Sequence, residues 1–287
     1  MLLRQCISSF HVRCFSSLST TSKVTQKLAF VSDIHLEKRQ TIPKIQSLTT
    51  SSPIHGLALL GDIGNPFDPN YFRFLYNCSN QFEHVYLLAG NHEYYHSQKK
   101  IGHIRNLKPM VTDQIHQVVN NINYIIGNQN ICFLDNDVAQ LPNNNVLLGS
   151  TLWSHYNVFS KGKGKTPKYL VDFNQFVNKE HFTSKKWLKK TLENNKNDRN
   201  NIVVMTHYIP TFQLVHSDFH DSLRPSFIEY DDQNRFYTNL EHLMGPPIHK
   251  WICGHSHRNM KVEINQTKLE INAQHKVDEL PISYVDL

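Results

Sequence analysis

Five apolar stretches of this sequence end in residues that can bind a cation or transfer a proton. Each stretch has the pattern of a buried strand and is followed directly by carboxylate, amide or imidazole side chains. These residues are Asp33 and His35, Asp62, Asn91 with His92 and Glu93, His207, and His255 with His257. Such side chains at strand ends indicate metal binding combined with acid–base chemistry.

The elements that must position these residues are five predicted strands separated by helices. The strands are expected at residues 27–31, 56–60, 85–89, 202–206 and 251–253. Helices are predicted from Asp68, an N-cap followed by Pro69, to about residue 81, at 112–126 with Gly127 as the stop, and at 183–192. Alternating strands and helices place the chain in the α/β class, where ligands bind at the carboxyl ends of the strands.

The donors are too many for one metal ion. Two aspartates, one amide and four imidazoles other than His92 give seven candidates, and sharing of Asp62 would divide them into two sets of four. Mixed nitrogen and oxygen donors suit manganese, iron or zinc, with magnesium as a further option. Two such ions about 3.5–4 Å apart, sharing a hydroxide, are a recurrent device for in-line attack on phosphorus.

Each motif has an ordinary structural alternative when taken alone. A single histidine at a strand end is commonly a hydrogen-bonded structural residue, and Gly-Asp is commonly a turn. A second Asp-x-His, Asp218 to His220, follows no apolar strand and is interpreted as chance. The order of the motifs, each at the end of a strand, favours the functional interpretation.

The motifs resemble those of the calcineurin-like metallophosphoesterase superfamily over roughly residues 28–272. The resemblance implies a four-layer α-β-β-α sandwich of two mixed sheets. It assigns Asp33, His35, Asp62 and His257 to a first metal ion, and Asp62, Asn91, His207 and His255 to a second. His92 matches the family's catalytic histidine, which is not a ligand and which protonates the leaving oxygen or stabilises charge on the phosphoryl group.

Departures from the family pattern narrow the expected activity. Many members have an aspartate three residues after the shared aspartate, where it orients the catalytic histidine. This chain has Asn65 there, which can accept a hydrogen bond but carries no charge. The Asp-Arg-Gly signature of protein Ser/Thr phosphatases is absent after Gly61-Asp62.

We therefore expect a di-metal hydrolase of a small phosphomonoester or phosphodiester. A non-catalytic scaffold with the same fold and a nuclease are the alternatives.

Other residues could shape the substrate pocket. Trp153, His155 and Tyr156 follow the strand 146–148 and are expected either to line the pocket or to pack the loop. His216, His220 and Arg224 lie in an irregular stretch, where the arginine could bind a phosphate oxygen. The basic loop 161–167 could contact a phosphorylated substrate or simply be solvated.

Composition excludes several classes of protein. The sequence has 39% apolar and 19% charged residues, and no stretch approaches the roughly 18 apolar residues of a membrane span. The net charge is +6; removing the four positive charges of residues 1–32 leaves +2, which gives no reason to expect nucleic acid or an anionic membrane as a partner. Five irregularly spaced cysteines argue against a disulfide framework and for a reducing compartment.

The N-terminal residues 1–26 have the composition of a mitochondrial transit peptide, because they are rich in serine, contain Arg4 and Arg13 and lack acidic residues. A matrix location is the expectation, and an untargeted disordered tail on a cytoplasmic protein is the alternative. Residues 27–287 are expected to form the phosphoesterase domain. The sequence gives no indication of the oligomeric state.

Overall fold

The computed structural model describes residues 26–46, 52–95, 106–156, 168–195, 201–215, 236–274 and 277–287. The expected transit segment up to residue 25, the basic loop 161–167, and His216, His220 and Arg224 lie outside the described residues.

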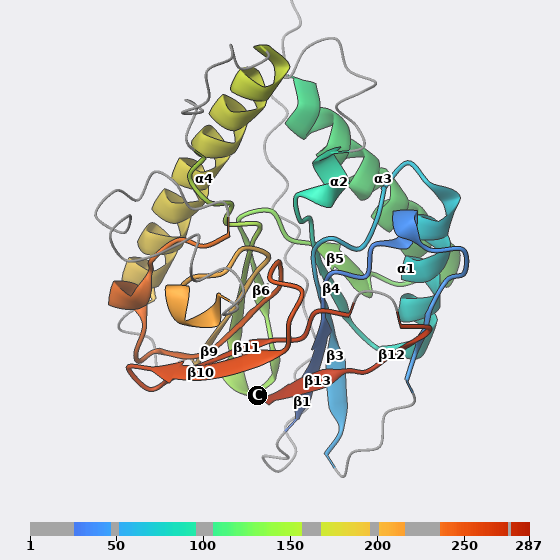
Figure 1. Ribbon diagram of the computed structural model, residues 1–287. Helices are drawn as coiled ribbons and strands as arrows, with labels where there is room; N and C mark the ends of the chain where they lie inside the picture. The colour runs from blue at the N-terminus through green and yellow to red at the C-terminus, as the bar shows by residue number, and fades with distance from the viewer. Residues whose placement is uncertain are drawn as a thin grey trace, which may run out of the picture.

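Two mixed sheets form the centre of the fold (Figure 1). The first has the order β13 (Ser283–Asp286), β1 (Lys27–Val31), β3 (Ile54–Leu60), β4 (Val85–Leu88) and β5 (Ile131–Phe133). The second has the order β10 (Met260–Ile264), β11 (Thr267–Ile271), β9 (Ile248–Cys253), β8 (Ile202–Thr206), β7 (Val146–Ser150) and β6 (Asp137–Gln140). A short pair joins β12 (Glu279–Leu280) to β2 (Lys44–Ile45).

The strands that carry the predicted site run parallel within each sheet. β1, β3 and β4 pair in parallel in the first sheet, as do β8 and β9 in the second, whereas β13, β6 and β10 pair antiparallel with their neighbours. The carboxyl ends of the parallel strands therefore open onto common edges, as the sequence pattern predicts.

Both faces of the central strands are buried, which explains their continuous apolar sequence. In β1, Leu28 and Phe30 belong to the core between the sheets, together with Val203 and Met205 of β8. The alternate residues Ala29 and Val31 belong to the core under the helices. Alternate residues of one strand thus pack into two separate apolar cores.

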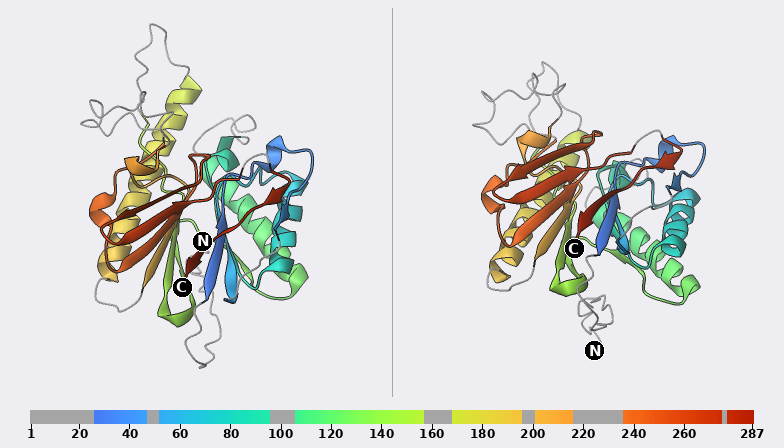
Figure 2. Two further views of the ribbon diagram at one scale, coloured as in Figure 1. Left: turned by 60° about the horizontal axis from the view of Figure 1, so that its bottom comes forward. Right: turned by 90° about the horizontal axis from the view of Figure 1, so that it is seen from below.

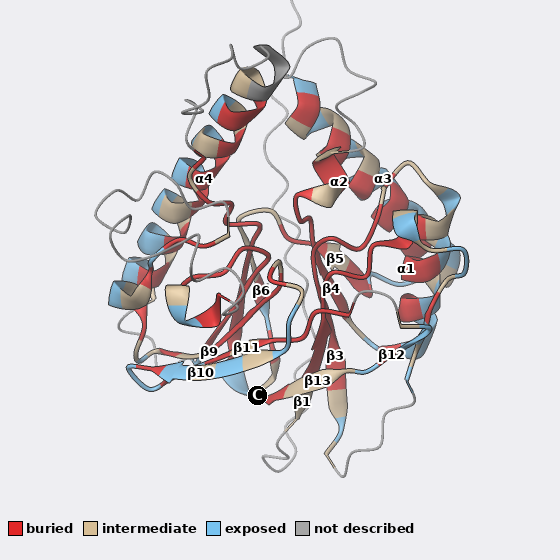
Figure 3. Cartoon of the chain, in the orientation of Figure 1, coloured by how far each residue is buried: buried red, intermediate tan, exposed pale blue. Residues whose placement is uncertain are grey.

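Helices cover the outer faces of both sheets, as Figure 2 shows. The helices are α1 (Pro69–Gln81), α2 (His92–Tyr95), α3 (Leu107–Ile126) and α4 (Lys168–Asn194), with single 3-10 turns η1 (Leu36–Lys38), η4 (Pro142–Asn144), η5 (Phe212–Leu214) and η9 (Glu241–Leu243). α1 and α3 lie against the first sheet and α4 against the second. Their buried sides face inward in Figure 3, which completes the predicted four layers.

The helix ends follow the predicted signals, but two helices are longer than expected. The Asp68 side chain accepts a hydrogen bond from the Asn70 N–H at 2.8 Å, and Gly127 ends α3 at φ 80°. α3 begins at Leu107 rather than residue 112, and α4 begins at Lys168 rather than 183. The buried residues of α1 include Tyr71, Phe74, Leu75 and Cys78; the sequence predicts an apolar face of Phe72, Leu75 and Tyr76, but Phe72 and Tyr76 are only partly buried.

Two further observations concern the cysteines and the character of the helices. Among the described residues, Cys78 and Cys253 are free and buried. Within the part of the chain that is described, no helix combines the length and apolar character needed to span a bilayer.

Candidate metal centre

Backbone hydrogen bonds join the loops at the carboxyl ends of β1 and β3, and the loop after β4 lies close against them. The Asp33 N–H donates to the Gly61 carbonyl at 3.1 Å, and the His35 N–H donates to the Asp62 carbonyl at 2.9 Å. Gly61 has φ 85°, and a Cβ there would lie 2.5 Å from the Gly90 nitrogen, so only glycine fits. The glycine of the Gly-Asp motif therefore lets the Asp62 and Asn91 loops lie against each other.

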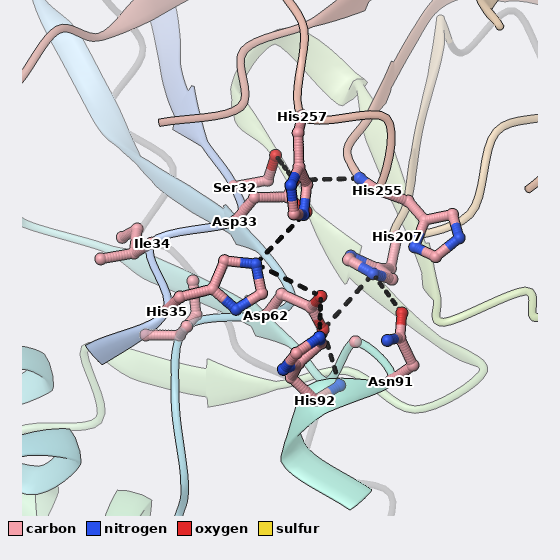
Figure 4. Close-up of polar contacts among 12 residues, drawn as sticks. Ser32, Asp33, Ile34, His35, Asp62, Asn91, His92, His207, His255 and His257 are labelled. Atoms are coloured by element: carbon pink, nitrogen blue, oxygen red, sulfur yellow. Dashed lines mark hydrogen bonds and ion pairs between the residues drawn. The ribbon is translucent and has the colours of Figure 1, made fainter. Parts of the chain in front are cut away.

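Two loops of the second sheet close the site from the opposite side. The Gly254 N–H donates to the His207 carbonyl at 3.0 Å, which joins the loops after β8 and β9. A Cβ at Gly254 would lie 2.6 Å from Ser32 Oγ, so this glycine brings the His255–His257 loop against the loop after β1. Figure 4 shows the labelled side chains gathered between the two sheets.

Five of the seven candidate ligands have left-handed backbone conformations. They are Asp33 (φ 57°), His35 (φ 53°), Asp62 (φ 53°), His255 (φ 70°) and His257 (φ 55°). A left-handed conformation is unfavourable for residues that carry a Cβ, and such strain concentrates at functional sites. The loops therefore hold these side chains in place at a cost to stability.

Asp33, His35, Asp62 and His257 form the first group of candidate ligands, with one donor atom of each lying within 4.8 Å of the others. His35 Nε2 lies 3.1 Å from His257 Nε2, and His257 Nε2 lies 3.2 Å from Asp33 Oδ1. Two ring nitrogens aimed at one point, beside a carboxylate oxygen, are an arrangement that a cation would satisfy.

Asp33 gives a test of whether this group fits a metal ion. Its Oδ2 accepts hydrogen bonds from Ser32 Oγ at 2.5 Å and from the His255 N–H at 2.9 Å. Its Oδ1 is fully buried and accepts no hydrogen bond. Burial raises the pKa of Asp33, but the neighbouring imidazoles of His257 and His207 outweigh it and lower the pKa. An ionised, buried oxygen aimed at two imidazoles fits a metal ligand.

The second group consists of Asp62, His207 and His255, with Asn91 beside them. His207 Nε2 lies 3.4 Å from Asp62 Oδ1 and 3.0 Å from Asn91 Oδ1. The opposite nitrogen, Nδ1, donates to the Leu60 carbonyl at 2.8 Å and so fixes the ring. The His255 ring lies 4.1 Å from that of Tyr208 and 5.1 Å from that of His207, measured between centroids.

Asp62 belongs to both groups, and its two oxygens face different sides. Oδ2 lies 3.8 Å from His35 Nε2, whereas Oδ1 lies on the His207 side and accepts the His92 N–H at 2.8 Å. Burial raises the pKa of Asp62, but the charges of His207, His92 and His35 lower it well below its usual range. The carboxylate is thus ionised and lies between the two groups of candidate ligands.

Two buried glutamates support the residues of the site. The sequence motifs assigned neither of them to a metal ion or to catalysis. Glu93 accepts hydrogen bonds from the backbone N–H groups of Asp62, Ile63, Gly64 and Gly90 at 2.7–3.2 Å. Burial and the charge of Asp62 raise its pKa to about 7, against the effect of these donors. The sequence signal for Glu93 was its position at the end of the motif Gly90-Asn91-His92-Glu93.

Glu37 is the second of these glutamates, and it lies beside His92. Its Oε1 is 3.0 Å from His35 Nδ1 and 3.1 Å from His92 Nδ1. Burial lowers the pKa of His92, but the hydrogen bond to Glu37 and the charge of Asp62 outweigh it and raise the pKa above its ordinary value. The His92 side chain is 21% exposed, so a substrate can reach it.

Trp153 and Tyr156 pack in the interior. Trp153 is 2% exposed and its ring lies 5.3 Å from that of Tyr94 and 5.6 Å from that of Tyr208. The Tyr156 hydroxyl lies 2.8 Å from the Tyr208 hydroxyl. Of the two interpretations open from the sequence, the structure supports loop packing for these two residues. The aromatic layer that they form backs His207 and His255.

Comparison with known families identifies the chain as a metal-dependent phosphoesterase. The family model for calcineurin-like phosphoesterases matches residues 26–259. The chain belongs to the calcineurin-like phosphoesterase family.

Two individual proteins illustrate the relationship. The chain is 25% identical over 284 residues to the uncharacterized protein L509 of Acanthamoeba polyphaga mimivirus, covering 91% of this chain and 96% of that protein. The crystal structure of phosphopantetheinyl hydrolase (PptH) from Mycobacterium tuberculosis is similar with a TM-score of 0.55 and 15% identity, covering 88% of this chain and 90% of that chain. This likeness shows a common fold.

Proposed function

We propose that the protein hydrolyses a small phosphomonoester or phosphodiester at a centre of two divalent cations. The observation that carries the proposal is the position of Asp62, whose two oxygens face separate groups of ligands. One cation would be held by Asp33, His35, Asp62 and His257, and the other by Asp62, Asn91, His207 and His255. Manganese, iron or zinc suits these donors best, with magnesium as a further option.

The cations would supply an activated water and neutralise charge on the phosphoryl group for in-line displacement. The chain's own part is to place an acid at the leaving oxygen, and His92 has the position for it. Its Nε2 lies 4.0 Å from Asp62 Oδ2, at the edge of the ligand groups, and its Nδ1 lies against Glu37. A partly exposed imidazole with a raised pKa can hold the proton that the leaving group takes.

Three variants test these roles. Asp33→Ala and His257→Ala should lose metal and turnover together. His92→Ala should keep its metal and slow hydrolysis by about 10²–10⁴-fold, the usual contribution of a general acid. Metal content is measured by elemental analysis, and activity with Mn²⁺ against bis-aryl phosphate, aryl phosphate and nucleotides. A phosphopantetheinyl ester is added to the panel because phosphopantetheinyl hydrolase has a similar fold.

The exposed His242 on η9 offers a matched control, because its imidazole is neither a candidate ligand nor the candidate acid. It should match the natural protein in metal content and activity. Full activity of His92→Ala on all substrates would contradict the role given to His92. At most one metal equivalent per chain, under saturating supply, would contradict the two-cation centre.

We also propose that residues 1–26 direct the protein to the mitochondrial matrix and that residues 27–287 form the phosphoesterase domain. The serine- and arginine-containing, acid-free composition of the first segment supports the targeting. Fusion of residues 1–30 to a fluorescent protein is the test, and a cytosolic signal would contradict it.

A further inference from the structure

One carboxylate oxygen contacts both the candidate ligand His35 and the candidate acid His92. Glu37 Oε1 lies 3.0 Å from His35 Nδ1 and 3.1 Å from His92 Nδ1, and the Glu37 side chain is 7% exposed. The two imidazole rings meet edge to face, with centroids 4.4 Å apart and planes at 76°. A buried carboxylate therefore stands at the junction of metal binding and proton transfer.

The contact fixes which ring nitrogens face the candidate ligand groups. An ionised carboxylate can only accept hydrogen bonds, so both Nδ1 atoms must carry hydrogen and donate to it. His35 then presents the lone pair of Nε2 to the ligand group, 3.1 Å from His257 Nε2. His92 likewise directs Nε2 toward Asp62. One acceptor thus sets the orientation of both rings.

Local structure explains how Glu37 reaches this position. His35 has a left-handed conformation, and the single turn η1 starts at the next residue. The turn folds Glu37 back over the ring of His35, two residues earlier, and against α2, which begins at His92. The position therefore depends on the backbone conformation of the ligand loop.

Asn65, the residue at the family's usual orienting position, makes a different contact. Its Oδ1 accepts the backbone N–H of Phe67 at 3.1 Å and so stabilises the turn before α1. The charged partner of His92 comes instead from the loop after β1.

We propose, building on the function proposed above, that Glu37 is the positioning residue of this site. It orients His35 for metal binding and His92 for proton donation at the same time. Removing the charge of Glu37 should therefore both weaken metal binding and slow proton donation. His92→Ala, by contrast, should slow proton donation and leave metal binding unchanged.

Glu37→Gln tests this, with Glu279→Gln on the exposed part of β12 as the matched control. The first measurement is Mn²⁺ affinity by titration, independent of turnover. Loss of a partner behind a ligating histidine typically weakens metal binding or activity about 10–100-fold. Glu37→Gln should show this weakening, whereas His92→Ala and Glu279→Gln should bind Mn²⁺ like the natural protein.

The second measurement is kcat at saturating Mn²⁺ for aryl and alkyl phosphates. Because an acid matters most for a poor leaving group, Glu37→Gln should lose about 10–100-fold in kcat on alkyl phosphates, with less loss on nitrophenyl phosphate and little change in KM. The double variant Glu37→Gln, His92→Ala should be no slower than His92→Ala, because the two residues act as one unit.

Thermal unfolding verifies that the variants fold, and Glu37→Asp gives a second variant that keeps the charge but shortens its reach. It should fall between Glu37→Gln and the natural protein in both measurements. A loss of equal size on every leaving group, or a change in only one of the two measurements, overturns the shared role. An inactive natural protein would contradict the proposed function, while the Mn²⁺ titration would still test Glu37.

Discussion

On the side of the five-stranded sheet, buried carboxylates hold the functional residues in place. Glu37 holds the rings of His35 and His92, and Glu93 collects the backbone N–H groups around Asp62. On the side of the six-stranded sheet, a backbone carbonyl and an aromatic ring are among the groups that contact the imidazoles. His207 donates to a backbone carbonyl, and the ring of Tyr208 lies against His255.

The difference shows how the two sheets share the site. Both ligand groups take members from both sheets, since Asp33, His35 and Asp62 face His257, and Asp62 faces His207 and His255. The first sheet supplies the two carboxylate ligands, whereas the second supplies three imidazoles, two of which contact the ring of Tyr208. Cations bound between them would therefore join the sheets as well as perform chemistry.

Asp62→Asn should have the largest effect, because Asp62 serves both groups. Activity should fall by more than about 10³-fold, since loss of a shared charged ligand exceeds the usual loss from one oxyanion-hole donor. Metal content should fall below one equivalent per chain. Kinetics and elemental analysis on the same sample give the result, and two retained equivalents would contradict the bridging role.

Glu93→Gln tests the carboxylate-supported side alone. A glutamine has one acceptor oxygen, so two of the four buried N–H donors would lose their partner, at about 1–3 kcal/mol each. We expect a loss of about 3 kcal/mol in the free energy of unfolding, measured by denaturant titration. The exposed Glu263→Gln on β10 is the control, and equal stability of the two variants would show that Glu93 supports nothing.

Metal removal tests whether the cations join the two sheets. A ligand present at 100 times its Kd stabilises the folded state by about 2.7 kcal/mol. The natural protein with Mn²⁺ should lose about this much on addition of a chelator, whereas Asp62→Asn should lose little. Thermal unfolding with and without chelator measures this, and an equal shift in both proteins would exclude the site as its origin.

The aromatic side should respond to acid through His181 of α4. Burial lowers its pKa to about 4, and the neutral ring donates from Nδ1 to the carbonyls of Leu152 and Trp153 at 3.2 and 2.9 Å. The unfolded chain has the ordinary pKa of about 6.5, so it binds the proton first as the pH falls. This contribution to stability is present above about pH 6.5 and is lost between pH 6.5 and 4.

Between pH 7.5 and 5 the natural protein should thus lose about 1–2 kcal/mol more than His181→Gln. Denaturant titration at the two pH values gives the difference. Phe182→Ser, at the neighbouring position with 70% of the residue exposed, should change stability by less than about 0.5 kcal/mol. An identical pH response of His181→Gln and the natural protein would exclude His181 as the cause.

The sequence predicted the strands and helix ends that have strong local signals. Apolar runs with polar ends located β1, β3, β4, β8 and β9, and Asp68 and Gly127 marked helix ends. The first half of α4 was missed because its inward face contains the polar Glu180 and His181, which interrupt the apolar period. The β10–β11 hairpin was missed because its turn is Asn265-Gln266, without a glycine.

The site was predictable as a set of residue types but not as a network. The candidate ligands lie at strand ends, where the pattern itself brings them to one edge. Glu37 and Glu93 act through contacts with distant backbone and side chains, and these depend on the left-handed conformation of the loops. No periodicity encodes such contacts, so their roles required the structure.

The left-handed conformations also bear on which substitutions this chain would accumulate if its activity were no longer under selection. At Asp33, His35, Asp62, His255 and His257, glycine is the residue that this backbone accommodates without strain. Asp33→Gly should therefore unfold at higher denaturant than Asp33→Ala, by about 1 kcal/mol. In a descendant released from catalysis, glycine at these five positions would relieve the backbone strain and remove the candidate ligands in the same step. None of the five is glycine in this sequence.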